Sequence, residues 1–426
     1  MVLFLLAIEG LLFFILKQMF EGLNTNLYVI STIIVAVNSL LFLVTIGRNS
    51  KNKGEYLILF FAYIARLFIL YFDIFGRDIF ILPNSGYDSE MYNGNAMNFV
   101  NGDGSGRGGF YSIILGYIYM MFGEQRIVAQ YFNVILSMYS IFIVKKILEQ
   151  LMLSTKVRVF VLILFSFIPN YLIMSSILLR ESIMIFLLTY SFYFFIRWWK
   201  NGSSYNLLIA IALPIVTSIF HSGGIAPAVG YVICYIFYDR LNQKYRLNLS
   251  TIFSGAFFLL LFFVVNTFFG DMLFGKFKSV DSITDLSKTA STFASGGSSY
   301  SIGINANSIP SIIIYTPIRV LYFIASPLPW DWRGFNDIFA FVFSGLFYLL
   351  SYLFVFRVLI EKNIPQRSLL IASLIVAVSS VLLFAWGVSN AGTALRHREK
   401  FIGIYMVMFA LSLNIIKLKR RSKKKI

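Results

Sequence analysis

Residues 27–46 read LYVISTIIVAVNSLLFLVTI, twenty consecutive positions without a charged side chain. At a rise of about 1.5 Å per residue, a helix of this length matches the hydrocarbon core of a bilayer, which is about 30 Å thick. Similar stretches recur along the 426-residue chain, of which 58% is hydrophobic and only 13% is charged. A soluble domain carries about 25% charged residues. We therefore expect most of this chain to lie in lipid.

The apolar runs predict an all-α integral membrane protein that forms a single polytopic membrane domain over residues 1–426. About twelve transmembrane helices are expected, at 2–20, 27–46, 55–73, 127–147, 158–178, 182–197, 205–220, 222–239, 250–269, 337–357, 367–387 and 401–416. Two further apolar segments, 109–123 and 311–326, are short, and we expect them to be re-entrant or interfacial. The first span has no basic leader and no small-residue cleavage site, so it is expected to be retained.

Lysine and arginine set the expected orientation. The net charge of +17 arises largely from short loops between apolar runs and from the tail 417–426. This pattern places both termini in the cytoplasm and argues against nucleic acid as a partner. The loops expected on the cytoplasmic side are 47–54, 145–157, 197–204, 240–248 and 358–367. Two large extracytoplasmic loops remain, 74–126 and 270–336, and functional residues concentrate in such loops.

The first of these loops contains the acidic sequence Gly86-Tyr-Asp-Ser-Glu-Met-Tyr92. Asp88 and Glu90 have apolar and aromatic neighbours, which favour a carboxylate with a tuned pKa that acts as a general base. The alternative is that both are solvated carboxylates.

The chain has a single cysteine, Cys234, which excludes an intrachain disulfide and a cysteine-rich metal site.

Arg180-Glu181 lies where one predicted span turns into the next. Either the two side chains form an internal ion pair at this junction, or Arg180 presents its planar guanidinium to phosphate oxygens. A second charge, Arg66, lies within the predicted third span and requires a partner or a wet cavity.

Both histidines of the chain are expected near the outer face. His221 follows a predicted span, and His397 stands between Arg396 and Arg398 in the last outer loop. These residues could bind an anionic lipid head group at an active site. The alternatives are a hydrogen-bonded structural histidine and ordinary anchoring to anionic head groups.

The second large loop ends in Pro-Leu-Pro-Trp-Asp-Trp-Arg, residues 327–333. Trp330 and Trp332 could pack on the apolar faces of sugar rings, while Asp331 and Arg333 hydrogen-bond sugar hydroxyls. An interfacial aromatic belt is the alternative. Arg319, in the short segment 311–326, is a further candidate anion contact.

Several of these motifs resemble a known family. Gly86–Tyr92 resembles the opening motif of the EpsG-like branch of Wzy-type polysaccharide polymerases. Arg180-Glu181, followed by a span and then Phe220-His221-Ser222, is similar to the arginine-led helix and later histidine motif of that family. The similarity covers roughly residues 80–240. The first outer loop also resembles that of GT-C glycosyltransferases, whose catalytic carboxylate would match Asp88, and a GT-C-like arrangement of helices is compatible with the predicted spans.

The resemblance implies an enzyme of a bacterial cytoplasmic (inner) membrane. It would join undecaprenyl-pyrophosphate-linked oligosaccharide repeats into a capsule, exopolysaccharide or O-antigen, alongside a flippase and a chain-length regulator. Asp88 or Glu90 would be the base. The residues expected to bind pyrophosphate are Arg180, Arg319, Arg396 and Arg398. Those expected to bind the rest of the substrate are Tyr92, His221, Trp330, Asp331, Trp332, Arg333 and His397.

Two other functions remain as alternatives to the polymerase. A GT-C glycosyltransferase would move a single sugar from a lipid phosphate, and a divalent metal near Asp88 and Glu90 would favour it. A transporter or flippase of lipid-linked oligosaccharide would show inverted repeats and charges in mid-span. For the polymerase no cofactor is expected, because the lipid pyrophosphate is already an activated donor.

Overall fold

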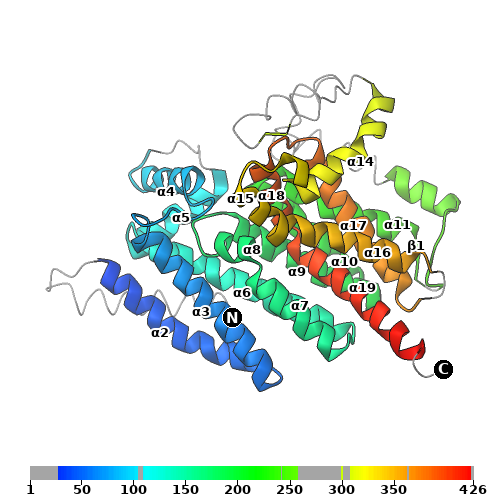
Figure 1. Ribbon diagram of the computed structural model, residues 1–426, viewed down its shortest axis with the longest axis horizontal. Helices are drawn as coiled ribbons and strands as arrows, with labels where there is room; N and C mark the ends of the chain where they lie inside the picture. Colours follow the sequence, from blue (N-terminus) through cyan, green and yellow to red (C-terminus); the bar gives the residue numbers. More distant parts are fainter. Residues whose placement is uncertain are drawn as a thin grey trace. The chain divides into compact units, whose positions relative to one another are not determined.

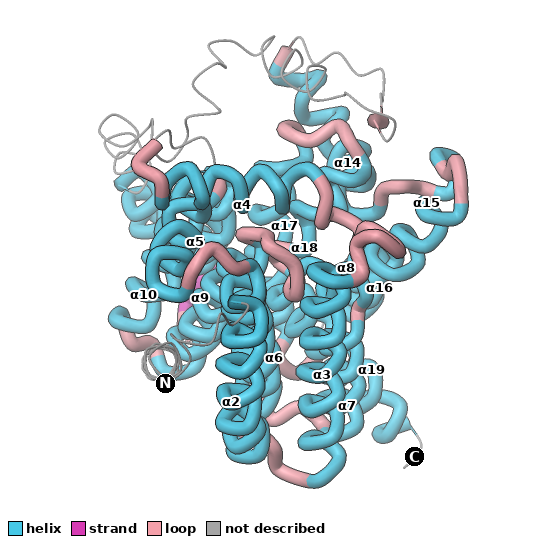
Figure 2. Tube along the Cα trace, turned by 90° about the vertical axis from the view of Figure 1, so that its left-hand side faces the viewer, coloured by secondary structure: helices cyan, strands magenta, loops and turns pink. Residues whose placement is uncertain are grey.

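The computed structural model describes residues 27–103, 109–240, 242–257, 299–300, 308–361 and 364–423. Helices make up nearly all of this part, and its one small sheet pairs β1 (Tyr238–Asp239) antiparallel with β2 (Lys244–Tyr245) (Figure 2). The prediction of an all-α protein is confirmed. The predicted span 2–20 lies outside the described residues; of the span 250–269, residues 250–257 are described and are helical.

Seven helices in the described part are long and apolar enough to cross a membrane, so the protein is membrane-embedded. Each coincides with a predicted span. They are α2 (Leu27–Arg48), α3 (Lys53–Phe75), α6 (Arg126–Gln150), α9 (Glu181–Asn201), the continuous run of α15 (Phe335–Ala340), π-turn η3 (Phe341–Gly345) and α16 (Leu346–Leu359), α17 (Arg367–Ala385) and α19 (Ile402–Lys423).

Several shorter helices complete this part of the chain. The two short apolar segments are indeed helices, α5 (Gly109–Phe122) and α14 (Ile309–Ala325). The predicted spans at 205–220 and 222–239 are also short, and the second begins with a 3-10 turn. The remaining bounds are α4 (Tyr87–Val100), α10 (Ser204–Phe220), η1 (Ser222–Ile225), α11 (Ala226–Phe237), η2 (Pro329–Asp331) and α18 (Ala391–Glu399).

The prediction of one continuous helix over 158–178 is wrong. The chain forms α7 (Thr155–Phe167), breaks at Ile168, and resumes as α8 (Pro169–Met174). Pro169 lacks a backbone N–H and its ring clashes with the preceding turn, so it favours the first turn of a helix, where α8 has it. An irregular stretch then leads to Glu181, the first residue of α9.

Figure 1 shows the helices coloured along the sequence, and the chain divides into two compact units. The first unit comprises Met1–Phe142 and Leu162–Ile183. The second comprises Ile143–Val161 and Met184–Ile426. Each unit is described on its own.

In the first unit, α2 packs against α3, α3 against α8, and α4 against α5. The fully buried Arg66 of α3 has uncharged partners. Its Nε donates to Ser137 Oγ at 2.8 Å, and its Nη1 donates to the carbonyl oxygens of Ala62 and Ser166, both at 3.0 Å. Its guanidinium also lies 5.2 Å from the ring centroid of Tyr171. The predicted need for polar partners in mid-span is thus met by neutral oxygens and an aromatic face.

In the second unit, α17 packs against α11, α14 and α19, and α16 packs against α19. The approach of α11 to α17 is close: a Cβ at Gly230 would lie 2.7 Å from the Cα of Val376. Small residues permit such contacts between membrane helices, where dispersion and hydrogen bonds replace the hydrophobic effect.

The basic loops of the second unit meet at one end of its helices. Ser154 N donates to Asn414 Oδ1 at 3.0 Å, and Lys417 Nζ donates to Ser154 Oγ at 2.9 Å. Gln366 Nε2 donates to the carbonyl oxygen of Leu151 at 3.3 Å. The segment 151–154, Gln366 and the C-terminal part of α19 therefore lie together.

Candidate functional site

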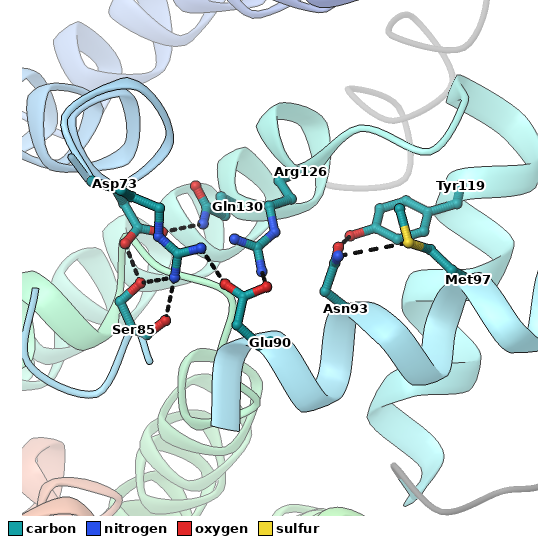
Figure 3. Close-up of polar contacts among 9 residues, drawn as sticks. Asp73, Ser85, Glu90, Asn93, Met97, Tyr119, Arg126 and Gln130 are labelled. Atoms are coloured by element: carbon teal, nitrogen blue, oxygen red, sulfur yellow. Dashed lines mark hydrogen bonds and ion pairs between the residues drawn. The ribbon is translucent and has the colours of Figure 1, made fainter. Parts of the chain in front are cut away.

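A buried carboxylate at the end of α3 fixes the loop that leads to α4. Asp73 is 1% exposed and accepts hydrogen bonds from Ser85 Oγ and, at 2.7 Å, from Gln130 Nε2 (Figure 3). Ser85 Oγ in turn accepts from Arg77 Nη2 at 3.0 Å. These bonds connect α3, the following loop and α6, so the position at which α4 begins is set by the polar end of a membrane helix.

Glu90 extends this network as its second carboxylate (Figure 3). It forms an ion pair with Arg77 and another, at 2.8 Å, with Arg126 Nη2. Burial alone would raise the pKa of Glu90, but the two arginines outweigh it and hold the pKa of this carboxyl below its usual value. A carboxylate held in its charged form by two cations is a weak base. Glu90, one of the two predicted bases, therefore has the contacts of a positioning residue.

Replacing Glu90 by glutamine is expected to lower the melting temperature in detergent slightly at pH 7. The folded pKa lies below the unfolded one, so the stabilisation is present above the unfolded pKa of about 4.3 and is lost as the pH falls through the folded pKa. The difference in melting temperature between wild type and Glu90→Gln should therefore shrink at pH 3.5. An equal difference at both values of pH would contradict this role for the ion pairs.

Asp88 and Tyr92 lie in the first two turns of α4, and Arg180 contacts Tyr92. Asp88 is half-buried in the first turn of α4, where the positive end of the helix dipole favours a carboxylate. Tyr92 is four residues later, on the same face of the helix, and is 2% exposed. The guanidinium of the half-buried Arg180 lies 5.8 Å from the Tyr92 ring centroid. The structure thus brings the predicted site residues Tyr92 and Arg180 together, with Asp88 one turn before Tyr92.

Asn133 of α6 holds the irregular stretch that carries Arg180. Its Nδ2 donates to the carbonyl oxygens of Ile177 at 2.8 Å and Leu179 at 3.0 Å, and it also reaches Tyr111 Oη at 3.1 Å. Asn133 is completely buried. Because these carbonyls precede α9 and have no helical donors, the amide fixes the backbone from which Arg180 projects.

In the second unit the two histidines meet. The rings of His221, at the end of α10, and His397, in α18, have centroids 4.7 Å apart. Phe384 lies against both, at 5.4 and 5.0 Å. Gly223 N donates to His221 Nδ1 at 3.1 Å, and the buried Lys400 Nζ lies 2.8 Å from His397 Nδ1. With Nδ1 accepting in both rings, the neutral imidazoles carry their protons on Nε2 and can donate to oxygens.

The neighbouring Arg398 donates hydrogen bonds to the C-terminal end of α14. Arg398 is 1% exposed, and its Nη1 donates to the carbonyl oxygens of Ile324 at 3.2 Å and Ser326 at 2.7 Å. Its Nε donates to Ser344 Oγ at 3.0 Å, which itself donates to the buried Glu399 at 2.7 Å. The last carbonyls of a helix lack partners within it, so a cation there stabilises its end. The prediction that Arg398 holds a pyrophosphate is therefore revised: its burial and its backbone partners make it a positioning residue.

The aromatic corner follows directly on this end of α14. Trp330 is 67% exposed and its Nε1 donates to Tyr322 Oη at 3.0 Å. The half-buried Trp332 donates from Nε1 to the carbonyl oxygen of Pro327 at 3.1 Å. Burial raises the pKa of the Asp331 carboxyl between them. Trp330 thus presents an anchored and accessible aromatic face.

The three other predicted arginines of this unit lie in different environments. Arg319 is 5% exposed; its Nη1 donates to Ser389 Oγ at 3.1 Å and its guanidinium lies 5.0 Å from the Trp386 ring centroid. Arg333 is exposed, and its Nη2 donates to the carbonyl oxygen of Ser299 at 3.0 Å. Arg396, one residue before His397, is half-buried. Of the predicted arginines in α14 and α18, Arg396 is less buried than Arg319 and Arg398, and it is next to His397 in the chain.

Sequence reasoning missed several residues that build these two groups. They are Asp73, Gln130, Asn133, Ser344, Ser389 and Lys400. Most are single polar side chains at or near the ends of apolar helices, and that position is the signal that could have found them. Among the described residues, no group of three or more His, Cys, Asp and Glu side chains is arranged to hold a metal ion.

Comparisons with protein-family models, with curated proteins and with solved structures find no match to this chain.

Proposed function

We propose that this protein is a glycosyltransferase that joins lipid-pyrophosphate-linked oligosaccharide repeats into a polysaccharide. The observation that carries the proposal is the basic group in the second unit. Six cationic or protonatable side chains lie in or around α14, α18 and the end of α10: His221, Arg319, Arg396, His397, Arg398 and Lys400. Of these, the half-buried Arg396 and the two imidazoles suit a diphosphate, while Arg398 positions the end of α14. The exposed Trp330, which follows α14, suits a sugar.

The chemical step is a substitution at an anomeric carbon. A hydroxyl oxygen of the incoming repeat forms a bond to the anomeric carbon of the growing chain. The bond from that carbon to the pyrophosphate oxygen breaks, and its electron pair leaves with the lipid pyrophosphate. Arg396 and the two imidazoles, all in the second unit, would stabilise the charge that develops on the leaving group. The base that accepts the hydroxyl proton is predicted from the sequence alone, as Asp88 of the first unit.

The helices support an outer-face location for this group. α17 runs from Arg367, in a basic loop, to Ala385, next to Phe384 and the histidines. Its 19 residues are about 28 Å long, which is close to the thickness of the hydrocarbon core. Because lysine and arginine accumulate on the cytoplasmic side, the histidine end of α17 would face outward and both termini inward. The same proposal places the protein in the inner membrane of a bacterium. It includes about twelve spans and interfacial positions for α5 and α14.

Replacing Arg396 by alanine is expected to reduce polymer formation about 100-fold or more, because one charge-assisted contact to the leaving group is lost. Purified protein would be incubated with a lipid-pyrophosphate-linked repeat, and the lipid-linked products and the released lipid would be resolved. Lys156→Ala is the matched control, because it removes an exposed cation in the basic loop 145–157.

The released lipid separates the candidate functions. Longer lipid-linked oligomers with free lipid pyrophosphate support the polymerase. Transfer of one sugar with release of a lipid monophosphate would instead identify a single-sugar transferase. Equal polymer from Arg396→Ala, Lys156→Ala and wild type would overturn the assignment of Arg396.

A further inference from the structure

The second unit contains a cavity of about 770 Å³ among its basic loops. Four separate segments line it, 150–152, 199–200, 243–245 and 364–371. We call it the basic pocket. It lies at the N-terminal end of α17 and the C-terminal end of α9, whereas the two histidines lie at the other end of α17. It is thus separate from the basic group assigned to the sugar-transfer step.

The basic pocket carries three cations and no carboxylate. Among the described residues, Lys200, Lys244 and Arg367 line it, and no Asp or Glu does. Lys200 Nζ donates to the carbonyl oxygen of Gln150 at 2.7 Å, and Arg367 donates to that of Glu361. These acceptors are uncharged, so the positive charge is not neutralised. Lys244 is exposed, and its ammonium has no partner among the described residues.

The nearby carboxylates are paired with other cations. Asp239, the strand partner of Lys244, forms an ion pair with Arg246, with 3.1 Å between Asp239 Oδ2 and Arg246 Nη1. The side chain of Glu361 pairs with Lys419. The pocket therefore keeps a positive potential that an anionic ligand can neutralise.

The walls of the pocket are held in place by aromatic and backbone contacts. The Trp199 ring stacks on Tyr238 with centroids 3.7 Å apart, and Tyr245 Oη donates to the carbonyl oxygen of Ser368 at 3.1 Å. Gln366 adopts a left-handed backbone conformation, with φ of 58°, and donates to the carbonyl oxygen of Leu151. Because these segments are already held in place, little conformational entropy is lost when a ligand binds.

Position and composition together indicate the ligand. The pocket lies where the candidate spans α9 and α17 end, which is the depth of lipid head groups. Aromatic, apolar and cationic side chains line it together, as they do at the interface of a bilayer. Basic pockets between membrane helices bind the phosphates of anionic lipids.

We propose that the basic pocket binds the phosphate head group of an anionic phospholipid. Lys200, Lys244 and Arg367 would contact the phosphate oxygens, and Trp199 and Tyr245 would flank the glycerol and the start of the acyl chains. The proposal does not depend on the sugar-transfer reaction. The expected cytoplasmic position of these loops is consistent with it, but the binding chemistry requires only the interface.

The test measures lipid binding to the purified, delipidated full-length protein by native mass spectrometry. Cardiolipin and phosphatidylglycerol are the anionic probes, phosphatidylcholine is the zwitterionic probe, and glycerol phosphate is the soluble one. We expect one saturable anionic lipid per chain. Lys244→Gln should raise its Kd about fivefold, and the triple variant Lys200→Gln, Lys244→Gln, Arg367→Gln about 100-fold, since each cation near a membrane surface contributes a similar factor.

Lys156→Gln is the matched control, because it removes an exposed cation from a neighbouring loop without touching the pocket, and its Kd should stay within about twofold of wild type. Lys244 is itself exposed, so its single variant should fold normally even if the triple variant does not. Equal weakening by Lys244→Gln and Lys156→Gln would overturn the proposal in favour of general surface attraction. Glycerol phosphate binding as tightly as the lipid would overturn the lipid assignment and identify a soluble phosphate ligand.

Discussion

Asp88→Asn should reduce polymer formation about 100- to 10,000-fold, the contribution expected of a positioned general base. The amide keeps the size of the side chain and its place in the first turn of α4, but it cannot accept a proton. The measurement is the rate at which purified protein extends a lipid-pyrophosphate-linked repeat. In cells, single repeats should accumulate on the lipid carrier while long chains disappear.

Two other carboxylates provide the comparison for Asp88. Asp103→Asn changes an exposed residue just after α4 and should leave the rate unchanged. Glu90→Gln should lower stability slightly but keep much of the rate, because Glu90 is occupied by Arg77 and Arg126. A normal rate in Asp88→Asn, with a strong loss in Glu90→Gln, would reverse the two assignments.

Arg398→Ala should destabilise the protein by about 3–5 kcal/mol. The substitution removes the donors for the carbonyls of Ile324 and Ser326 and a cation that interacts favourably with the buried Glu399. Unsatisfied carbonyls and a less compensated carboxylate in an apolar setting are costly. Equilibrium unfolding in mixed detergent would measure the change.

Arg396→Ala is the matched control, since it removes the same side chain type two residues earlier in α18, where the residue is half-buried. Its free energy of unfolding should lie within about 0.5 kcal/mol of wild type. The two variants thus separate a loss of structure from a loss of substrate binding. If Arg398→Ala were as stable as Arg396→Ala, the role of Arg398 at the end of α14 would be wrong.

The sequence by itself determined the membrane helices. An uncharged run of about twenty residues, such as 27–46, must satisfy its backbone within a helix once it is in lipid, so its length alone predicts α2. Long, mainly apolar runs likewise predicted α3, α6, α17 and α19, although the run of α3 contains Arg66. The prediction failed at 158–178. The sequence stays apolar through Pro169, but proline has no backbone N–H, so the helical hydrogen bonds are interrupted there.

The tertiary structure decided which candidate side chains meet. The sequence proposed His221 and His397 as separate outer-face residues, and only the packing of α17 on its neighbours brings both rings against Phe384. It also proposed Arg396 and Arg398 for the same role. Residues two apart on a helix point in different directions, so one guanidinium is buried against the end of α14 and the other is partly exposed. Hydropathy fixes the length of a helix in a membrane, but its rotation depends on partners that are distant in the chain.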